Sequence, residues 1–213
     1  MKTCPKARGK NGQSKISPKR AVEMLKEGNK RFVNEKMKKY CYLEMAKQTE
    51  DKGQFPFAAV LSCVDSRIPV ETVFDQAIGD LFVARVAGNF VNTDIVGSLE
   101  FAVASGIKAI LILGHTSCGA VKGACDGATG HRALDSMLSN LQPAVKATIA
   151  STGRVATSTD PKFVQAVADV NVKLAMADLR SQSALINEAI TNERLILVGG
   201  MYNLKNGVVK IHD

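Results

Sequence analysis

The sequence predicts an α/β protein in which a mostly parallel β-sheet is flanked by helices, with an N-terminal helical arm. Two observations support this fold class. Several short runs are apolar at consecutive positions, as strands buried on both faces must be, and stretches of helical periodicity lie between them. Strands and helices that alternate in this way need crossover connections, which are typical of parallel sheets.

The first element expected is a helix over residues 18–35. Ser17 is a favoured N-cap residue, and Pro18 is a favoured first helical residue. Small and apolar residues then recur at helical spacing at Ala21, Leu25, Gly28 and Phe32. Later stretches predict helices over residues 94–105 and 163–191, and a loop rich in Ser, Thr and Gly over residues 150–161.

Four apolar runs predict buried strands, because each is too short for a helix. They are residues 56–62, 81–86, 108–113 and 194–198. Near the C-terminus, Asn206-Gly207 is a strong signal for a two-residue turn, so residues 202–211 are expected to form a hairpin that ends in an edge strand. Ligands of open α/β sheets bind near the carboxyl ends of the strands, which is where a functional site is expected.

Length and charge define the organisation of the chain. With 213 residues, 46% of them hydrophobic, the chain is long enough for one substantial core and short for two. Residues 1–40 carry 13 lysines and arginines but only three glutamates, a net charge of +10, whereas the whole chain carries +8 and residues 41–213 therefore −2. We expect a basic, flexible segment over residues 1–16 and a single domain over residues 17–213.

The charge pattern bears on possible partners. Nucleic-acid binding by the basic segment is the weaker interpretation, because the segment lacks interleaved aromatic residues and a recognised module. No stretch of 18 residues is both apolar and free of charge, so no membrane span is expected. The N-terminus also lacks the apolar core of a secretory signal, although a leader peptide could have been removed. The cytoplasm is the expected location.

Two short motifs follow two of the predicted strands: Cys63-Val64-Asp65-Ser66-Arg67 and His115-Thr116-Ser117-Cys118-Gly119. Thiolates and a neutral imidazole are ligands that suit Zn²⁺, so Cys63, His115 and Cys118 are the predicted ligands. If the chain turns helical directly after a strand ending at Gly114, His115 and Cys118 share one helix face. The helix N-terminus would then lower the pKa of the thiol.

Three protein ligands leave one tetrahedral position open, as in catalytic zinc sites. Asp65 can fill it as a fourth ligand, or it can pair with Arg67 and accept a hydrogen bond from water there, which is the active arrangement. The competing interpretation is that Cys63 is a small buried hydrophobe at the end of an apolar strand. Cys4, Cys41 and Cys125 show no spacing of a disulfide framework, which favours a reducing compartment.

In these two motifs and in further segments, the chain resembles the β-class carbonic anhydrases over nearly its whole length. The similar segments beyond the metal motifs are residues 25–32, 74–76, 79–89, 97–103 and 114–122. The resemblance implies the β-class carbonic anhydrase fold and the reversible hydration of carbon dioxide to bicarbonate and a proton. It also implies Zn²⁺ held by Cys63, His115 and Cys118.

The resemblance further implies roles for individual residues. Asp65 orients and deprotonates the zinc water while Arg67 holds it, and Asp65 becomes the fourth ligand in a closed state. Gln54 matches a glutamine that donates a hydrogen bond to a substrate oxygen. The family is built on dimers whose partner subunit helps to wall the pocket, at positions that match Phe82, Ala87 and Phe101. Ordinary core packing of the two phenylalanines is the alternative.

One branch of the family is inhibited by bicarbonate bound beside a Trp, Arg and Tyr triad. The chain contains no Trp: Val60 occupies the matching position, although Arg85 matches the Arg. We therefore expect a site that is open near pH 7.5. The alternatives in function are hydrolysis of carbon disulfide or carbonyl sulfide on the same fold, and a zinc-dependent binding protein, which the presence of both Asp65 and Arg67 disfavours.

Overall fold

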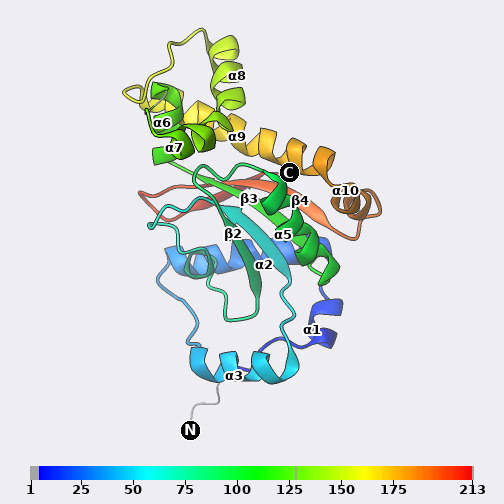
Figure 1. Cartoon of the computed structure of the whole chain (residues 1–213). Coiled ribbons are helices and arrows are strands. Elements are labelled where there is room, and N and C mark those ends of the chain that lie inside the picture. The colour runs from blue at the N-terminus through cyan, green and yellow to red at the C-terminus, as the bar shows by residue number, and fades with distance from the viewer. Residues whose placement is uncertain (1–4, 128, 213) are drawn as a thin grey trace.

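The computed structural model describes residues 5–127 and 129–212 and confirms the predicted α/β architecture (Figure 1). Its sheet has five strands in the order β2-β1-β3-β4-β5, of which the first four are parallel and β5 is antiparallel to β4. The strands are β1 Ala58–Ser62, β2 Leu81–Arg85, β3 Ala109–His115, β4 Ile196–Tyr202 and β5 Val209–His212. Strands β1 and β3 are buried throughout, as their uninterrupted apolar sequences predict.

The sheet has a helical layer on each face. Helix α2 (Pro18–Val33) packs on one face, toward the side chains of Ala58, Val60 and Leu111. Helices α5 (Thr93–Ala104) and α10 (Ala184–Thr191) pack on the other face, toward Leu61 and Ile112. Alternate residues of one strand therefore belong to opposite cores. Helix α9 (Pro161–Gln182) contributes to both cores, and with α6 (Gly119–Asp126), α7 (Arg132–Ser139) and α8 (Gln142–Thr152) it forms the upper lobe in Figure 1.

The predicted helices are confirmed with changes at their ends. Ser17 caps α2 by accepting a hydrogen bond from the Arg20 backbone N–H, as expected. The helical stretch predicted over residues 163–191 is two helices, because Ser183 has an extended backbone and its hydroxyl caps α10. That hydroxyl also donates to Glu100 Oε1 at 2.6 Å, which ties the break between the helices to α5. The loop predicted over residues 150–161 is shorter, since α8 continues to Thr152.

The last hairpin is confirmed, but its connection differs from the prediction. Strand β4 runs through Gly199 and Gly200 to Tyr202, beyond the predicted end at Val198. The turn is a longer loop over residues 203–208 instead of a two-residue turn at Asn206-Gly207. Gly207 has a φ of 74° and donates its N–H to Asn203 O at 2.8 Å, so its left-handed backbone closes this loop.

The segment expected to be flexible, residues 1–16, is bound to the domain over residues 5–16, and residues 1–4 lie outside the described residues. A short helix, α1 (Lys10–Ser14), lies against the domain, and its Gln13 is only 6% exposed. Gln13 Nε2 donates to Pro56 O at 2.7 Å and to Ser105 O at 3.0 Å. Basic side chains of residues 5–40 also pair with carboxylates, in the ion pairs Arg8–Asp80, Arg20–Glu27, Lys26–Glu23 and Arg31–Asp75.

Several helices were not predicted from the sequence, and the expectation for one cysteine needs correction. Helix α3 (Tyr42–Lys52) and the short helix α4 (Val70–Val73) were not predicted, nor were α7 and α8. Cys41 is disulfide-bonded, so the expectation that the cysteines outside the metal motifs form no disulfide is wrong for this residue. Among the described helices, none is long and apolar enough to cross a bilayer.

Replacement of Gln13 tests whether residues 5–16 stabilise the domain. We expect Gln13→Ala to lower the free energy of unfolding by about 1–3 kcal/mol, because two main-chain carbonyls lose their donor. Urea unfolding followed by circular dichroism measures the change. Asn11→Ala, an exposed position of the same helix, is the matched control and should shift stability by less than about 0.5 kcal/mol. Equal midpoints for the two variants would contradict a structural role of this segment.

Candidate metal centre

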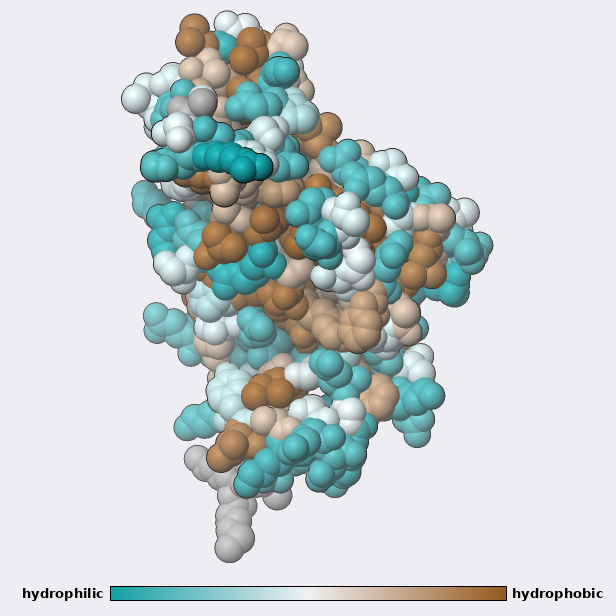
Figure 2. All heavy atoms as spheres, in the orientation of Figure 1, coloured by the Kyte–Doolittle hydropathy of each residue, from teal (hydrophilic) through white to brown (hydrophobic). Residues whose placement is uncertain are grey.

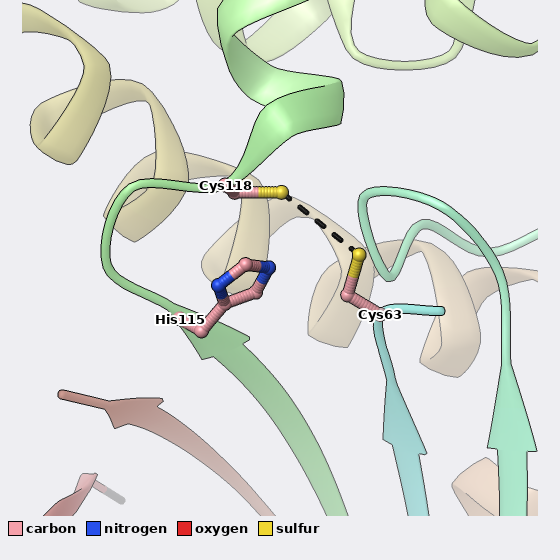
Figure 3. A group of neighbouring side chains, drawn as sticks. All are labelled: Cys63, His115 and Cys118. Atoms are coloured by element: carbon pink, nitrogen blue, oxygen red, sulfur yellow. Dashed lines mark hydrogen bonds between the residues drawn. The ribbon is translucent and has the colours of Figure 1, made fainter. Parts of the chain in front are cut away.

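Strand pairing brings the three predicted ligands together. Cys63 follows the last residue of β1, and His115 is the last residue of β3. Because these parallel strands are neighbours, with Ser62 paired to Leu113, their carboxyl ends meet at one edge of the sheet. The ligand atoms of Cys63, His115 and Cys118 all lie within 4.8 Å of one another, and all three residues are buried. Figure 3 shows the three side chains pointing toward one another.

The turn between His115 and Cys118 differs from the helical turn expected. Strand β3 includes His115 instead of ending at Gly114, and α6 begins only at Gly119. Ser117 has a φ of 55°, in the left-handed region, and Cys118 is extended. This reversal, and not a shared helix face, directs the Cys118 thiol back toward His115. The expected position of Cys118 at a helix N-terminus is confirmed, since it is the N-cap residue of α6.

The two thiols are electrostatically coupled. Cys63 Sγ and Cys118 Sγ are 4.0 Å apart. The pKa of Cys63 is lowered, first by the hydrogen bond with Cys118 and also by the Gly88 backbone N–H, while burial opposes this change. The pKa of Cys118 is raised, because it donates to Cys63 and is buried. Without a cation only one thiolate is favoured, whereas a divalent cation between the sulfurs would stabilise both.

His115 is prepared to be a ligand. Its Nδ1 lies 3.0 Å from Thr116 O, and since a carbonyl oxygen only accepts, Nδ1 carries the proton. In the neutral ring Nε2 then has a free lone pair, and this buried atom has no hydrogen-bond partner within the described part of the chain. An unsatisfied buried ring nitrogen beside two thiols is the arrangement that a metal ion completes. The residues present therefore fit Zn²⁺.

Asp65 and Arg67 form a dyad beside this cluster. Asp65 Oδ1 accepts from Arg67 N at 3.0 Å and from Nε at 2.9 Å, and Oδ2 accepts from Nη2 at 2.7 Å. These bonds hold the pKa of Asp65 well below its usual range, so the carboxylate is ionised at neutral pH. Asp65 Oδ2 is 3.9 Å from His115 Nε2, which places the dyad next to the candidate metal position.

Gly88 and Asn171 support Cys63 and were missed by the sequence analysis. Gly88 N donates to Cys63 Sγ at 3.3 Å, and Asn171 Nδ2, from α9, donates to Gly88 O at 2.8 Å. Gly88 has a φ of 86°, and a Cβ here would lie 2.7 Å from Leu141 Cδ1, so both conformation and space require glycine. A polar residue at a core position of an apolar helix periodicity, as Asn171 is, was the available signal.

The predicted substrate wall lies on an exposed apolar face. The rings of Phe82 and Phe101 meet edge to face with centroids 5.8 Å apart. Phe101 is 63% exposed, so core packing is wrong for this residue, whereas Phe82 and Ala87 are half-buried. Figure 2 shows hydrophobic atoms gathered over the middle of this face, where Figure 1 places α5 and β2.

Gln54 is not brought to the cluster within one chain. It is exposed and precedes β1, whereas Cys63 follows the opposite end of that strand. The five residues of β1 separate the two positions by about 13–17 Å at the usual rise per residue. Its predicted contact with substrate therefore requires a second subunit.

Among the described residues, Cys125, His131 and His212 are not members of the cluster formed by Cys63, His115 and Cys118. Cys125 is a free, buried cysteine of α6, and it takes no part in a disulfide framework. Burial raises its pKa to about 11, so it is an unreactive thiol. His131 and His212 are exposed surface histidines.

Comparisons with known proteins decide the family. A family model described as carbonic anhydrase matches residues 58–209. The solved structure of a β-carbonic anhydrase from Aspergillus fumigatus is similar with a TM-score of 0.70 and 28% identity, covering 87% of each chain. The chain belongs to the β-carbonic anhydrase family.

Relatives of this carbonic anhydrase cover almost the whole chain. Carbonic anhydrase 2 of Mycobacterium tuberculosis is 32% identical over 92% of this chain and 94% of its own length. A carbonic anhydrase of Mycolicibacterium smegmatis is 30% identical over the same shares. A tetrameric β-carbonic anhydrase of Sordaria macrospora has a TM-score of 0.69 at 27% identity, covering 87% of this chain and 90% of its own.

The resemblance seen in the sequence is thus confirmed. The chain is a carbonate dehydratase, and hydration of carbon dioxide is the general activity of its family. Hydrolysis of carbon disulfide or carbonyl sulfide receives no support from these relatives.

Removal of one sulfur ligand tests the candidate metal centre. We expect Cys118→Ser to be purified with little or no zinc, because a neutral hydroxyl is a poor ligand where a thiolate is needed. Cys125→Ser, which also changes a buried free cysteine, should bind zinc as the unmodified protein does. Elemental analysis of freshly purified protein measures both. Zinc at one ion per chain in Cys118→Ser would contradict the assignment of this ligand.

Proposed function

We propose that the protein hydrates carbon dioxide to bicarbonate and a proton, with Zn²⁺ held by Cys63, His115 and Cys118. The observation that carries the proposal is the buried convergence of two thiols with His115 Nε2, beside an ionised carboxylate 3.9 Å away. When bound, zinc supplies the Lewis acidity that makes water a nucleophile at neutral pH, as is established for carbonic anhydrases.

The dyad of Asp65 and Arg67 accepts the proton of the reacting water. Asp65 is ionised and acceptor-only, so it can orient a water by accepting a hydrogen bond and can then take its proton. Arg67 fixes the direction of this carboxylate with three hydrogen bonds. All three bonds also stabilise the ionised form, so Asp65 keeps its charge and remains an acceptor directed at the reacting water. In this arrangement Asp65 points to Arg67, which supports a site that is open near pH 7.5.

Carbon dioxide is small and apolar, and the apolar face formed by Phe82 and Phe101 suits it. We assign Phe82, Ala87 and Phe101 to the wall of the substrate pocket, with Gln54 of a second subunit as a donor to a substrate oxygen. An aromatic residue as exposed as Phe101 is typical of an interface. The active form is therefore proposed to be a homodimer or a higher homo-oligomer.

The location of the protein is proposed from composition alone. The cytoplasm fits the absence of a regular cysteine framework in the sequence. The disulfide at Cys41 counts against a strictly reducing compartment. The proposed activity involves neither nucleic acid nor a membrane.

Replacement of Asp65 tests the proposed base. We expect Asp65→Asn to retain zinc but to lower kcat for carbon dioxide hydration by about 10²–10⁴-fold, because the amide cannot take a proton. Stopped-flow hydration assays with parallel zinc analysis measure both quantities. Asp178→Asn, an exposed carboxylate of α9, is the control and should be fully active. Unchanged hydration by Asp65→Asn would refute the role of this residue.

Charge introduced at Phe101 tests the oligomer. We expect Phe101→Asp to be a monomer with little hydration activity, because an ionised carboxylate in an apolar interface is strongly unfavourable. Size-exclusion chromatography with light scattering gives the oligomeric state, and stopped-flow gives the activity. Val155→Asp changes another exposed apolar residue, 81% exposed, and should alter neither property. A fully active monomer would overturn the proposal that the second subunit completes the site.

A further inference from the structure

The guanidinium of Arg85 bonds the main chain of the metal loop, residues 63–67. Arg85 is the last residue of β2 and pairs with Ser62 of β1, so it stands directly beside the start of this loop. Its Nε donates to Cys63 O at 2.9 Å, and its Nη2 donates to Asp65 O at 2.6 Å. Within the described residues, both bonds of this guanidinium go to carbonyl oxygens and none to a carboxylate.

The loop depends on such a contact because it leaves the sheet after Ser62. Val64 is 54% exposed, and the backbone of residues 63–65 is not paired with a strand. The Asp65 carbonyl accepts one turn bond, from Ile68 N at 3.1 Å, in addition to that from Arg85. Asp65 is thus held twice, on its backbone by Arg85 and on its carboxylate by Arg67.

The position of the Asp65 backbone decides where its carboxylate can go. Asp65 Oδ2 is 3.9 Å from His115 Nε2, so a small shift of the loop toward the cluster would let this oxygen join Cys63, His115 and Cys118 as a ligand of a metal ion bound there. Cys63, only two residues earlier, is fixed in the cluster. A clamp across the carbonyls of Cys63 and Asp65 therefore sets the separation between the ligand and the base.

We propose that Arg85 is a positioning residue that holds the metal loop so that the Asp65 carboxylate stays on Arg67 and off the metal. The proposal rests on the proposed function, since it concerns the same zinc site. Arginine suits this task because its planar fork presents two adjacent donors that reach two acceptors at once. Lysine carries the same charge but cannot bridge both carbonyls with one fixed geometry.

The test uses cobalt-substituted protein, whose visible spectrum reports the coordination of the metal without any need for catalysis. The variants are Arg85→Met, which keeps much of the length and removes the donors, and Arg85→Lys. Arg194→Met is the control, because it removes an exposed ion pair with Glu188 that is remote in the sequence and of little energetic value. Metal content and stopped-flow hydration by the zinc forms are measured in parallel.

We expect Arg85→Met to bind one metal per chain but to show a changed cobalt spectrum at pH 7.5, as Asp65 joins the metal. Hydration should fall by about 10–100-fold, as is usual when a residue supporting a metal site is lost. Arg85→Lys should lie between Arg85→Met and the unmodified protein, and Arg194→Met should match the unmodified protein. A spectrum of Arg85→Met identical to that of the unmodified protein would overturn the proposal.

A double-variant cycle separates positioning from general structural damage. In an Asp65→Asn background the carboxylate that would join the metal is absent, so Arg85→Met should then leave the spectrum unchanged. An equal spectral change in both backgrounds would refute action through Asp65. If Arg85→Met does not fold, Arg85→Lys carries the test, and a spectrum equal to that of the unmodified protein then refutes the proposal. Absence of hydration in the unmodified protein would refute the proposed function instead, while the cobalt spectra still decide the role of Arg85.

Discussion

The parallel pairing of β1 with β3 is the constraint on which the candidate site depends. The two strands are adjacent in the sheet and end at the same edge, with Ser62 beside Leu113. This register alone brings Cys63 next to His115, which is 52 positions further along the chain. Both strands are buried throughout, and a one-residue slip would move every side chain to the opposite face. The apolar cores on the two faces of the sheet therefore fix the geometry of the polar site at its edge.

The electrostatics of the cluster explain why it suits a divalent cation. Two buried thiols 4.0 Å apart oppose each other's ionisation, so the protein alone favours a thiolate at Cys63 and a thiol at Cys118. The orphaned Nε2 of His115 adds a lone pair with no proton donor to meet it. A cation satisfies all three groups together. In contrast, the charge of Asp65 is already compensated by Arg67. This carboxylate is therefore not needed as a metal ligand and can accept a hydrogen bond or a proton from water.

The main chain around the cluster is held from distant parts of the sequence. Gly88 donates to Cys63 Sγ, and its own carbonyl is held by Asn171 of α9, 83 residues away. Arg85 bonds the metal loop from β2 in the same region. The long helix α9 thus both covers the sheet and supports the site. Such contacts orient the groups that carry the chemistry and limit the movements available to them.

The sequence by itself determined the fold class, the strands and the donor set, because these depend on local patterns. Uninterrupted apolar runs identify strands buried on both faces, and the residue types of Cys63, His115 and Cys118 suit a zinc ion. The helix that begins at Pro18 was likewise predicted, from its N-cap residue Ser17. The strands and this helix were confirmed, with boundaries that moved by a few residues, whereas the turn expected at Asn206-Gly207 was not.

Only the tertiary structure decided how the groups meet. The left-handed turn at Ser117, the break between α9 and α10 at Ser183 and the docking of Gln13 all depend on contacts with distant segments. The hydrogen bonds of Gly88, Asn171 and Arg85 are also made with partners far along the chain, and only Asn171 carried a local signal, as a polar residue at a core position of its helix. A sequence specifies which donors and acceptors exist, whereas their pairing follows from the packing of the sheet and its helices.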